Sequence, residues 1–467
     1  MLPFSRRWLS GLIGTAFLFS SIGLLRAEIT TPVIVHEWGT FTCLQDEGGK
    51  ALGGINVDDE PVPDFVYGSG GLVIPQYSKS SRNLGLPPYG NNLSKGYVEG
   101  DPSVTMRLET PVLYFYPPKG QLASSVPPLD VHVAFHGGIL SEYYPVAEAK
   151  GFPSFGTSLT EATTTELTWK GVHLGSSGKP VETEDRVWTT PREVAASLLE
   201  VGSQVEHFLF YRGVGHLESP FALLGARGQH VGTQQKPLTF LINRTIHDKT
   251  ALPDSWLVEI KQDGSCAFRS CAPSTLTADS FHSGDFDPAN LTNLKASMQA
   301  ALVKEGLYPD EASAMLRTWE LSYFKSPGLR FFYIAPRKWV DQVLPLTITG
   351  APVDITRVMV GRIELVTNEQ QAALFILAEG PPPNLAAVKQ AAQNALNAGK
   401  LPKAEIDAFY RGEKPLTELG IPIPPLVRDY LSLGRFRDAL IVHEQSTRPS
   451  KALEQFIREN SLVPQKQ

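Results

Sequence analysis

The string His36-Glu37-Trp38-Gly39-Thr40-Phe41-Thr42 brings an imidazole, a carboxylate and two hydroxyl groups close together in the chain. A histidine and a glutamate could exchange protons with a substrate, or hold one ion, if their side chains met. The string continues the β-type run that starts at Val33, and neighbouring side chains of a strand point to opposite faces. We therefore interpret it as a structural strand with one polar face and a packed Trp38, and keep His36 and Glu37 as catalytic candidates by position alone.

Four further candidates lie on strand-like runs later in the chain. Arg107 and Glu109 are two positions apart and share one strand face, a common arrangement for an ion pair. Tyr211 and Arg212, together with carboxylates such as Glu142, could line a sugar cleft in which two carboxylates act as acid and base or nucleophile. The sequence does not reveal which carboxylates approach each other, so these residues carry no assigned roles.

Other reaction types are disfavoured by spacing. His136-Gly137-Gly138 is similar to the oxyanion-hole turn of lipases and esterases, but the chain lacks the Gly-x-Ser-x-Gly string of their nucleophile. His132 and His136 share a strand face, yet their Cα atoms would be about 13 Å apart, too far to ligate one metal directly. We identify no metal site and no cofactor site in the sequence.

The chain contains three cysteines. Cys266 and Cys271 lie in a turn-rich stretch and could close a small loop in an oxidising compartment. We therefore predict a disulfide bond between Cys266 and Cys271, and a buried free thiol at Cys43.

The N-terminal residues 1–27 have the three parts of a signal peptide. Arg6 and Arg7 precede an apolar run that ends at Leu25, and the small residue Ala27 precedes Glu28. Cleavage would remove three arginines and take the net charge from −6 to −9. We expect a secreted or periplasmic protein with no transmembrane segment after cleavage, and the acidic balance argues against a nucleic-acid partner.

The rest of the chain divides by pattern into a β-rich part and a helical part. Residues 28–379 contain short alternating runs separated by Gly, Pro and Asn turns, which favours an antiparallel β-sandwich-like unit. Two helical segments interrupt it at about 285–326. The break Gly380-Pro-Pro-Pro-Asn384 precedes a small helical C-terminal region, residues 385–467. The fold class predicted is therefore mainly β.

The two helices of the excursion need an apolar partner to be stable. We expect them to pack on each other and on the sheet with Trp319 largely buried. The expected floor is formed by residues on the following strands: Phe331, Tyr333, Val358 and Val360.

Several whole strings resemble a family of secreted bacterial proteins without an assigned function. They include residues 35–42, Glu109-Thr-Pro-Val-Leu-Tyr-Phe-Tyr116, Phe210-Tyr-Arg-Gly-Val-Gly215 and Val358-Met-Val-Gly-Arg362, and the likeness spans about residues 33–366. The resemblance implies export and one large β-rich unit with a helical excursion. It supplies no reaction and no site residue.

Two function classes follow. We favour an extracytoplasmic ligand-binding or envelope-associated protein, with an envelope component or a glycan as the ligand. The alternative is a secreted hydrolase or lyase that acts on a glycan through carboxylate and histidine residues, with the six candidates above as the place to look.

Overall fold

The computed structural model describes residues 31–57, 62–68, 93–154, 157–225, 239–244, 252–261, 263–272, 274–275, 277–401 and 420–463. The predicted signal peptide lies outside these ranges. The described chain is mainly β, with several antiparallel sheets, a helical excursion and C-terminal helices, which confirms the predicted fold class.

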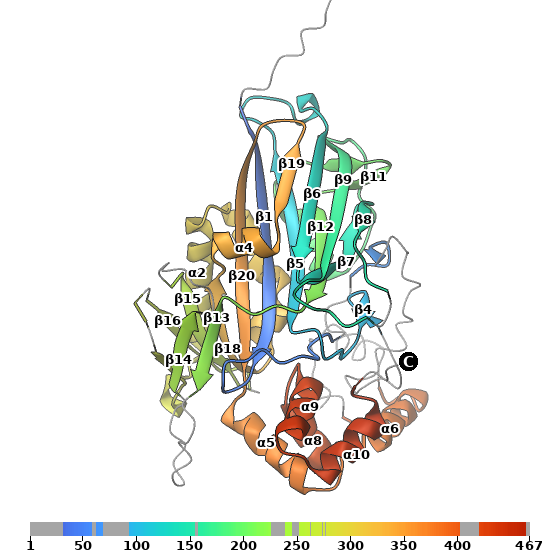
Figure 1. The fold of residues 1–467 in the computed structure, drawn as a ribbon, viewed down its shortest axis with the longest axis vertical. Coiled ribbons are helices and arrows are strands. Elements are labelled where there is room, and N and C mark those ends of the chain that lie inside the picture. The colour runs from blue at the N-terminus through green and yellow to red at the C-terminus, as the bar shows by residue number, and fades with distance from the viewer. Residues whose placement is uncertain are drawn as a thin grey trace, which may run out of the picture.

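A nine-stranded sheet forms the centre of the molecule (Figure 1). Its neighbouring strands are antiparallel except for the central pair β1–β20, which is parallel. Across the sheet the order is β16 (Cys266–Cys271), β15 (Ser255–Ile260), β18 (Gly328–Ile334), β20 (Val353–Leu365), β1 (Val33–Gln45), β5 (Met106–Tyr116), β12 (Leu209–Gly215), β7 (Gly138–Tyr144) and β2 (Tyr67–Gly68).

Smaller sheets cover one face of this central sheet. The apolar core between the layers takes alternate residues from the central strands, such as Phe41, Phe115 and Phe331, and Trp169 from the opposing sheet. The six-stranded sheet contains β11 (Gln204–Glu206), β10 (Leu199–Val201), β9 (Thr164–Leu174), β6 (Leu129–His136) and β19 (Leu346–Thr349), with β8 (Glu148–Lys150) beside β9. The three-stranded sheet contains β13 (Phe221–Gly225), β14 (Thr239–Arg244) and β17 (Thr277–Asp279), and a separate hairpin joins β3 (Leu93–Ser94) to β4 (Tyr97–Val98).

The helical excursion covers the opposite face. It contains α2 (Pro288–Lys304), α3 (Pro309–Thr318) and a π-helix (Glu320–Lys325), with the single turn α1 (Arg186–Thr189) nearby. Asp287 caps α2 by accepting a hydrogen bond from the Ala289 amide at 2.7 Å.

Trp319 is 1% exposed and stacks on Tyr323, which confirms that it belongs to the core. The floor beneath it includes Val358 and Val360 as expected, but Phe332 and Ile334 replace Phe331 and Tyr333. The latter two point into the core between the sheets, because side chains alternate along β18.

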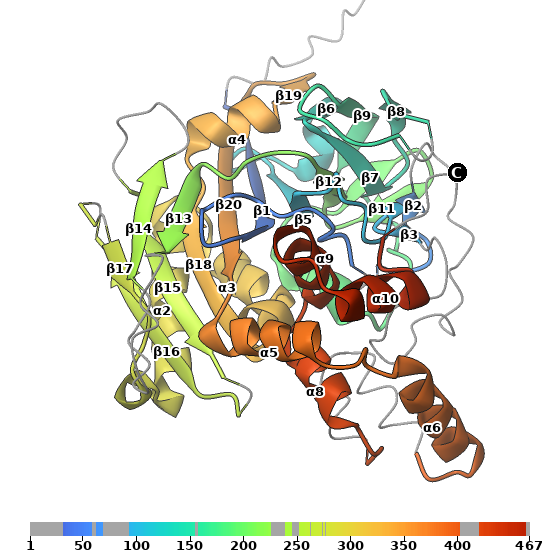
Figure 2. The ribbon, with the colours of Figure 1, turned by 60° about the horizontal axis from the view of Figure 1, so that its bottom comes forward.

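A further group of helices gathers at one end of the sheets (Figures 1 and 2). They share a core that includes Leu374, Val427, Leu440 and Phe456 and also takes in Leu44 of β1. These helices are α5 (Asn368–Glu379), α6 (Leu385–Asn397), α8 (Pro425–Ser432), α9 (Arg437–Thr447) and α10 (Lys451–Asn460). Helix α5 precedes the proline-rich break, so the helical packing unit starts before residue 385. A further helix, α4 (Arg337–Val343), adds Trp339 to the core between the sheets.

No helix within the described ranges has both the length and the apolar character needed to cross a membrane.

The predicted disulfide bond is wrong. Cys43, Cys266 and Cys271 are all free and buried. Cys266 and Cys271 occupy the two ends of strand β16. In an extended strand they are about 16 Å apart and point to opposite faces, whereas a disulfide needs Cα atoms within about 7 Å. The turn-rich flanks misled the prediction, because the residues between the cysteines are themselves a strand.

Replacing Trp319 with alanine should destabilise the entire β unit. The buried ring fills the space between the excursion and the sheet, so we expect a loss of about 3–5 kcal/mol in the free energy of unfolding. Urea denaturation followed by circular dichroism measures it. Val303→Ala on α2 is the control, because Val303 is 38% exposed and should change stability by less than about 1 kcal/mol. Equal stability of the two variants would contradict this packing.

Candidate functional site

The side chains of residues 36–42 on β1 point alternately to the two faces of the central sheet. His36 contacts the excursion, whereas Glu37 points into the core between the sheets. Trp38 packs under the excursion, and Phe41 packs against Trp339 on the other side. This confirms that His36 and Glu37 cannot form a joint site.

Position 39 must be a glycine because the neighbouring strand β5 passes close to it. The pairing of β1 with β5 shifts register between Trp38 and Thr40, where β5 bulges at Thr110-Pro111. A Cβ atom at Gly39 would lie 2.9 Å from the Cα atom of Pro111, so a larger residue does not fit.

Glu37 and Tyr211 meet in a buried ionic cluster. The Tyr211 hydroxyl donates to Glu37, and Arg357 Nε donates to Glu37 Oε2 at 2.5 Å. Arg357 also reaches Asp341, with 2.9 Å between Nη1 and Oδ1. Burial and the charge of Glu37 raise the pKa of Tyr211 well above its usual value, so the phenol stays neutral. The cluster joins β1, β12 and β20; Glu37 and Tyr211 are fully buried and offer no surface to a substrate, whereas Asp341 is partly exposed.

His36 forms a second polar cluster with the first turn of α3. Its Nδ1 lies 2.7 Å from Glu311 Oε2, and Glu311 also accepts hydrogen bonds from the Tyr116 hydroxyl at 2.8 Å and the Tyr308 amide at 2.7 Å. The imidazole contacts the rings of Tyr116 and Tyr308, which also contact each other, with centroids 5.4, 4.6 and 4.9 Å apart. His36 is 3% exposed and Tyr308 is 37% exposed, so the tyrosine is the outer member of the cluster.

The other three candidates lie on the excursion-facing side of the sheet, nearer the C-terminal helices. Arg107 Nη2 is 2.6 Å from Glu109 Oε1, so the predicted pair forms. Glu109 also accepts hydrogen bonds from Thr42 at 2.8 Å and from Arg435 at 2.9 Å. Arg212 lies on the next strand, β12, and pairs with Glu142 of β7.

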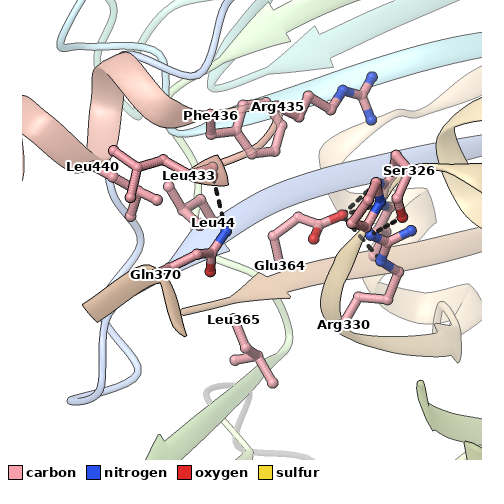
Figure 3. A pocket seen from close by; sticks show the side chains of 12 residues that line it. Leu44, Ser326, Arg330, Glu364, Leu365, Gln370, Leu433, Arg435, Phe436 and Leu440 are labelled. Atoms are coloured by element: carbon pink, nitrogen blue, oxygen red, sulfur yellow. Dashed lines mark hydrogen bonds and ion pairs between the residues drawn. The ribbon is translucent and has the colours of Figure 1, made fainter. Parts of the chain in front are cut away.

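A pocket opens on the same side of the central sheet, where β18 and β20 meet the C-terminal helices (Figure 3). We call it the arginine pocket. Its cavity volume is about 20 Å³, room for about one water molecule. In Figure 3, Leu433 and Leu440 lie toward one end, and Glu364 points toward Arg330 at the other. Its described lining consists of Leu44, Ser326, Pro327, Arg330, Arg362, Glu364, Leu365, Gln370, Leu433, Arg435, Phe436 and Leu440.

Arg330 binds the end of the π-helix. Its guanidinium donates to the carbonyl groups of Ser322 at 3.0 Å, Tyr323 at 2.9 Å and Ser326 at 2.8 Å. These carbonyls lie toward the C-terminal end of the π-helix, so the cation caps that end. Gly328, with φ +141°, makes room for this contact, because a Cβ atom there would lie 3.0 Å from Arg330 Nη2.

Arg362 has a different environment. Its Nε donates to Glu364 Oε1 at 2.5 Å, and its guanidinium lies 5.5 Å from the centre of the Tyr323 ring. Arg362 is 1% exposed, and its Nη1 has no hydrogen-bond partner among the described residues. A buried cationic donor without a partner costs about 1–3 kcal/mol or more, so this nitrogen is where an anionic ligand would gain most.

The charges at this end of the pocket persist at neutral pH. Burial alone would raise the pKa of Glu364, but Arg330, Arg362 and Arg435 outweigh it and hold that pKa below its usual range. Burial lowers the pKa of Arg330 to about 10 despite the attraction of Glu364. Both side chains are therefore ionised at neutral pH.

Sequence reasoning missed Arg330, Arg362 and Glu364. Arg330 sits between apolar residues in the run Leu329-Arg-Phe-Phe, and Arg362 and Glu364 alternate with Gly361, Ile363 and Leu365. Charges embedded in strands that are otherwise apolar are seldom left buried without a partner or a role. This pattern of charged residues within apolar strands was the sequence signal that could have identified the three residues.

No group of three or more His, Cys, Asp or Glu side chains in the described ranges is arranged to hold a metal ion.

Comparisons with known proteins add little. No protein-family model and no curated protein matches the chain. Among solved structures, the Fcho1 Mu homology domain of Danio rerio with bound Eps15 peptide aligns with a TM-score of 0.26 and 7% identity, over 73% of this chain and 96% of that one. A yeast delta-COP-I mu-homology domain complexed with a Dsl1 peptide has a TM-score of 0.24 and 8% identity, over 72% and 98%. Likeness at this level carries no argument about fold or function.

The ionised state of Glu364 should appear in the pH dependence of stability. Its folded pKa is lowered, so its stabilisation is complete above the unfolded value of about 4.5 and is lost as the pH falls through the folded value. Glu364→Gln should lower the free energy of unfolding by about 3–5 kcal/mol at pH 7, because it breaks a buried ion pair. The difference from wild type should shrink below pH 4.5.

Urea titrations at pH 7, 5, 4 and 3 measure this difference. Glu148→Gln is the control, since Glu148 also has a lowered pKa but forms an exposed pair with Lys170. If the difference in the free energy of unfolding between Glu364→Gln and wild type did not change with pH, the lowered pKa of Glu364 in the folded protein would be contradicted.

Proposed function

We propose that this chain is an exported ligand-binding protein, secreted or periplasmic, that takes a small anionic group into the arginine pocket. Export is supported by the pattern of residues 1–27 and by the resemblance of residues 33–366 to secreted bacterial proteins. The pocket is the feature that favours binding.

One observation carries the proposal. Arg362 Nη1 is a buried charged donor that has no partner among the described residues, and its residue lines the pocket. Arg330 donates through Nη1 and Nη2 to the carbonyl groups of Ser322, Tyr323 and Ser326, and its Nε lies 3.5 Å from Glu364 Oε1 without a hydrogen bond. An anion beside Arg362 would satisfy the remaining donor in a partly desolvated setting, where charge-assisted hydrogen bonds are strong.

The surroundings are organised for such a ligand. β20 holds Arg362 at a central position of the sheet, opposite Thr42 of β1. Glu364 anchors the guanidinium from one side and the Tyr323 ring lies against it. A preorganised cation loses little conformational freedom on binding, which favours affinity.

Replacing Arg362 with methionine should abolish anion binding. Isothermal titration calorimetry with acetate, phosphate and sulfate, at constant ionic strength, should show at least one anion that binds wild type and binds Arg362→Met at least about tenfold more weakly. Arg317→Met is the control, because Arg317 is an exposed cation paired with Glu193. Circular dichroism verifies that both variants fold.

Binding of no anion by wild type, or equal binding by Arg362→Met and wild type, would refute the proposal. Arg362→Lys provides a second variant if the methionine variant unfolds. It keeps the charge but loses the fork geometry, so its affinity should fall between the two.

A second candidate function is a secreted hydrolase or lyase acting on a glycan. The specific observation in its favour is the His36–Glu311 pair. A buried carboxylate on Nδ1 fixes the tautomer of the imidazole and leaves Nε2 to exchange protons, as in general-base catalysis. It ranks second because His36 is 3% exposed and lies behind Tyr308.

This alternative predicts a glycan or ester substrate whose turnover depends on both members of the pair. His36→Gln and Glu311→Gln should each lower kcat by about 10²–10⁴-fold, the usual range for a lost general base. His132→Gln is the control, since His132 lies on β6 and hydrogen bonds to Thr168. A substrate screen with no turnover, or turnover that survives both substitutions, would exclude this pair as a catalytic site.

A further inference from the structure

Part of the long strand β20 has a neighbour on one side only. β20 pairs with β1 over its whole length, whereas β18 pairs with its residues 360–365 alone. The Ala335 amide then donates to the Met359 carbonyl at 2.7 Å, and Pro336 turns the chain into α4. No strand of the described chain lies beside residues 353–357 on that side, which is the part of β20 above α4 in Figure 1. We call residues 353–357 the open edge.

Every second residue of the open edge directs its backbone polar groups outward. The Pro352 carbonyl bonds to β1, whereas the Met359 carbonyl bonds on the β18 side, so the odd-numbered residues face away from β1. The amides of Ile355 and Arg357 therefore point outward, and neither bonds to a group in the described ranges. Arg357 is 7% exposed although its side chain is 1% exposed, so water reaches its main chain.

One side chain lies along the open edge. Arg337 Nη1 is 3.3 Å from the Ile355 carbonyl, which is a long hydrogen bond. The Arg337 side chain is 48% exposed, and its Nε is held by Asp341. Charged side chains on a strand edge commonly prevent unwanted pairing. A peptide amide can replace this contact without breaking the pair between Arg337 and Asp341.

The side chains beside the open edge form rows that stop at β20. Phe115 and Val35 are fully buried, but Ile355, the last member of their row, is only partly buried. A further strand would cover it with an apolar side chain. On the other face, Ile34 is followed by Asp354, which is exposed and forms no ion pair with a described residue. A basic residue opposite Asp354 would form a favourable cross-strand pair.

From these features we infer that the open edge is a docking site for an extended polypeptide segment, which adds to the sheet as an antiparallel strand in line with β18. Outward main-chain groups that recur about every 7 Å match an extended backbone, and such strand addition is a general mode of peptide recognition. The segment carries an apolar residue opposite Ile355 and a basic residue opposite Asp354. This site is separate from the arginine pocket and does not depend on it.

The probe is the hexapeptide acetyl-Thr-Val-Thr-Val-Lys-Val-amide, titrated into the full-length mature protein by calorimetry. Placed antiparallel to β20, its second valine lies opposite Ile355 and its lysine opposite Asp354. N-methylation of the second valine removes the amide that bonds to the Ile355 carbonyl, and should weaken binding at least about tenfold. N-methylation of the second threonine is the matched control, because that amide points to solvent. It should change the affinity by less than about threefold.

Variants of the protein locate the site. Ile355→Pro removes the outward amide and leaves the hydrogen bonds to β1 in place, so it should abolish binding of the hexapeptide. Ile355→Val keeps the amide and is the control, with an affinity within about threefold of wild type. Asp354→Lys, at an exposed position, gives a second variant if Ile355→Pro unfolds. It should favour the peptide with glutamate in place of lysine, reversing the wild-type preference.

Three results would overturn the inference. The first is no saturable binding of the hexapeptide by wild type up to about 1 mM. The second is an equal effect of the two N-methyl groups. The third is a wild-type dimer in sedimentation that Ile355→Pro converts to a monomer, because the open edge would then pair with a second copy of the chain.

Discussion

Parallel pairing of β1 with β20 is the contact on which the rest of the structure depends. It joins segments about 320 residues apart in register from Val33 and Val353 to Gln45 and Leu365. Parallel strands need a crossover connection, and here almost the whole β part of the chain forms it. This one register decides which side chains meet at the centre. It sets Glu37 opposite Arg357 and Thr42 opposite Arg362, and so creates both the buried cluster and the arginine pocket.

The central sheet is unusual in burying charge on both faces. On the side toward the smaller sheets, Glu37 accepts hydrogen bonds from Tyr211 and Arg357 within an apolar core. On the other side, Arg362 and Glu364 of β20 and Arg107 and Glu109 of β5 lie on either side of β1, where Thr42 is opposite both arginines. Replacing a buried pair with apolar residues is often neutral or stabilising, so such pairs are weak evidence for stability. A role in specifying one strand register, or in meeting a ligand, explains them better.

The helical excursion and the C-terminal helices contribute residues that surround the buried arginines of the central sheet. The π-helix provides backbone carbonyl groups that accept hydrogen bonds from Arg330, and its Tyr323 ring lies against Arg362. Its irregular geometry therefore places groups that contact both arginines. The segment between α8 and α9 brings Arg435 and Phe436 from the opposite side. The arginine pocket thus belongs to no single element. Packing among three parts of the chain creates it, and each part alone would expose its charges to water.

From sequence alone, the period of hydrophobic residues determined the mainly β class, the helical excursion at about 285–326, the burial of Trp319 and the opposite directions of His36 and Glu37. These features are local, because side-chain alternation and helix starts depend on neighbours in the chain. Tertiary structure alone decided that Glu37 meets Tyr211, that His36 meets Glu311, and that Arg330, Arg362 and Glu364 share a pocket. It also overturned the Cys266–Cys271 bond, since the strand pairing of β16 holds the thiols apart. Spacing in the chain does not encode such contacts, because the register of strands hundreds of residues apart is set by the packing of the entire core.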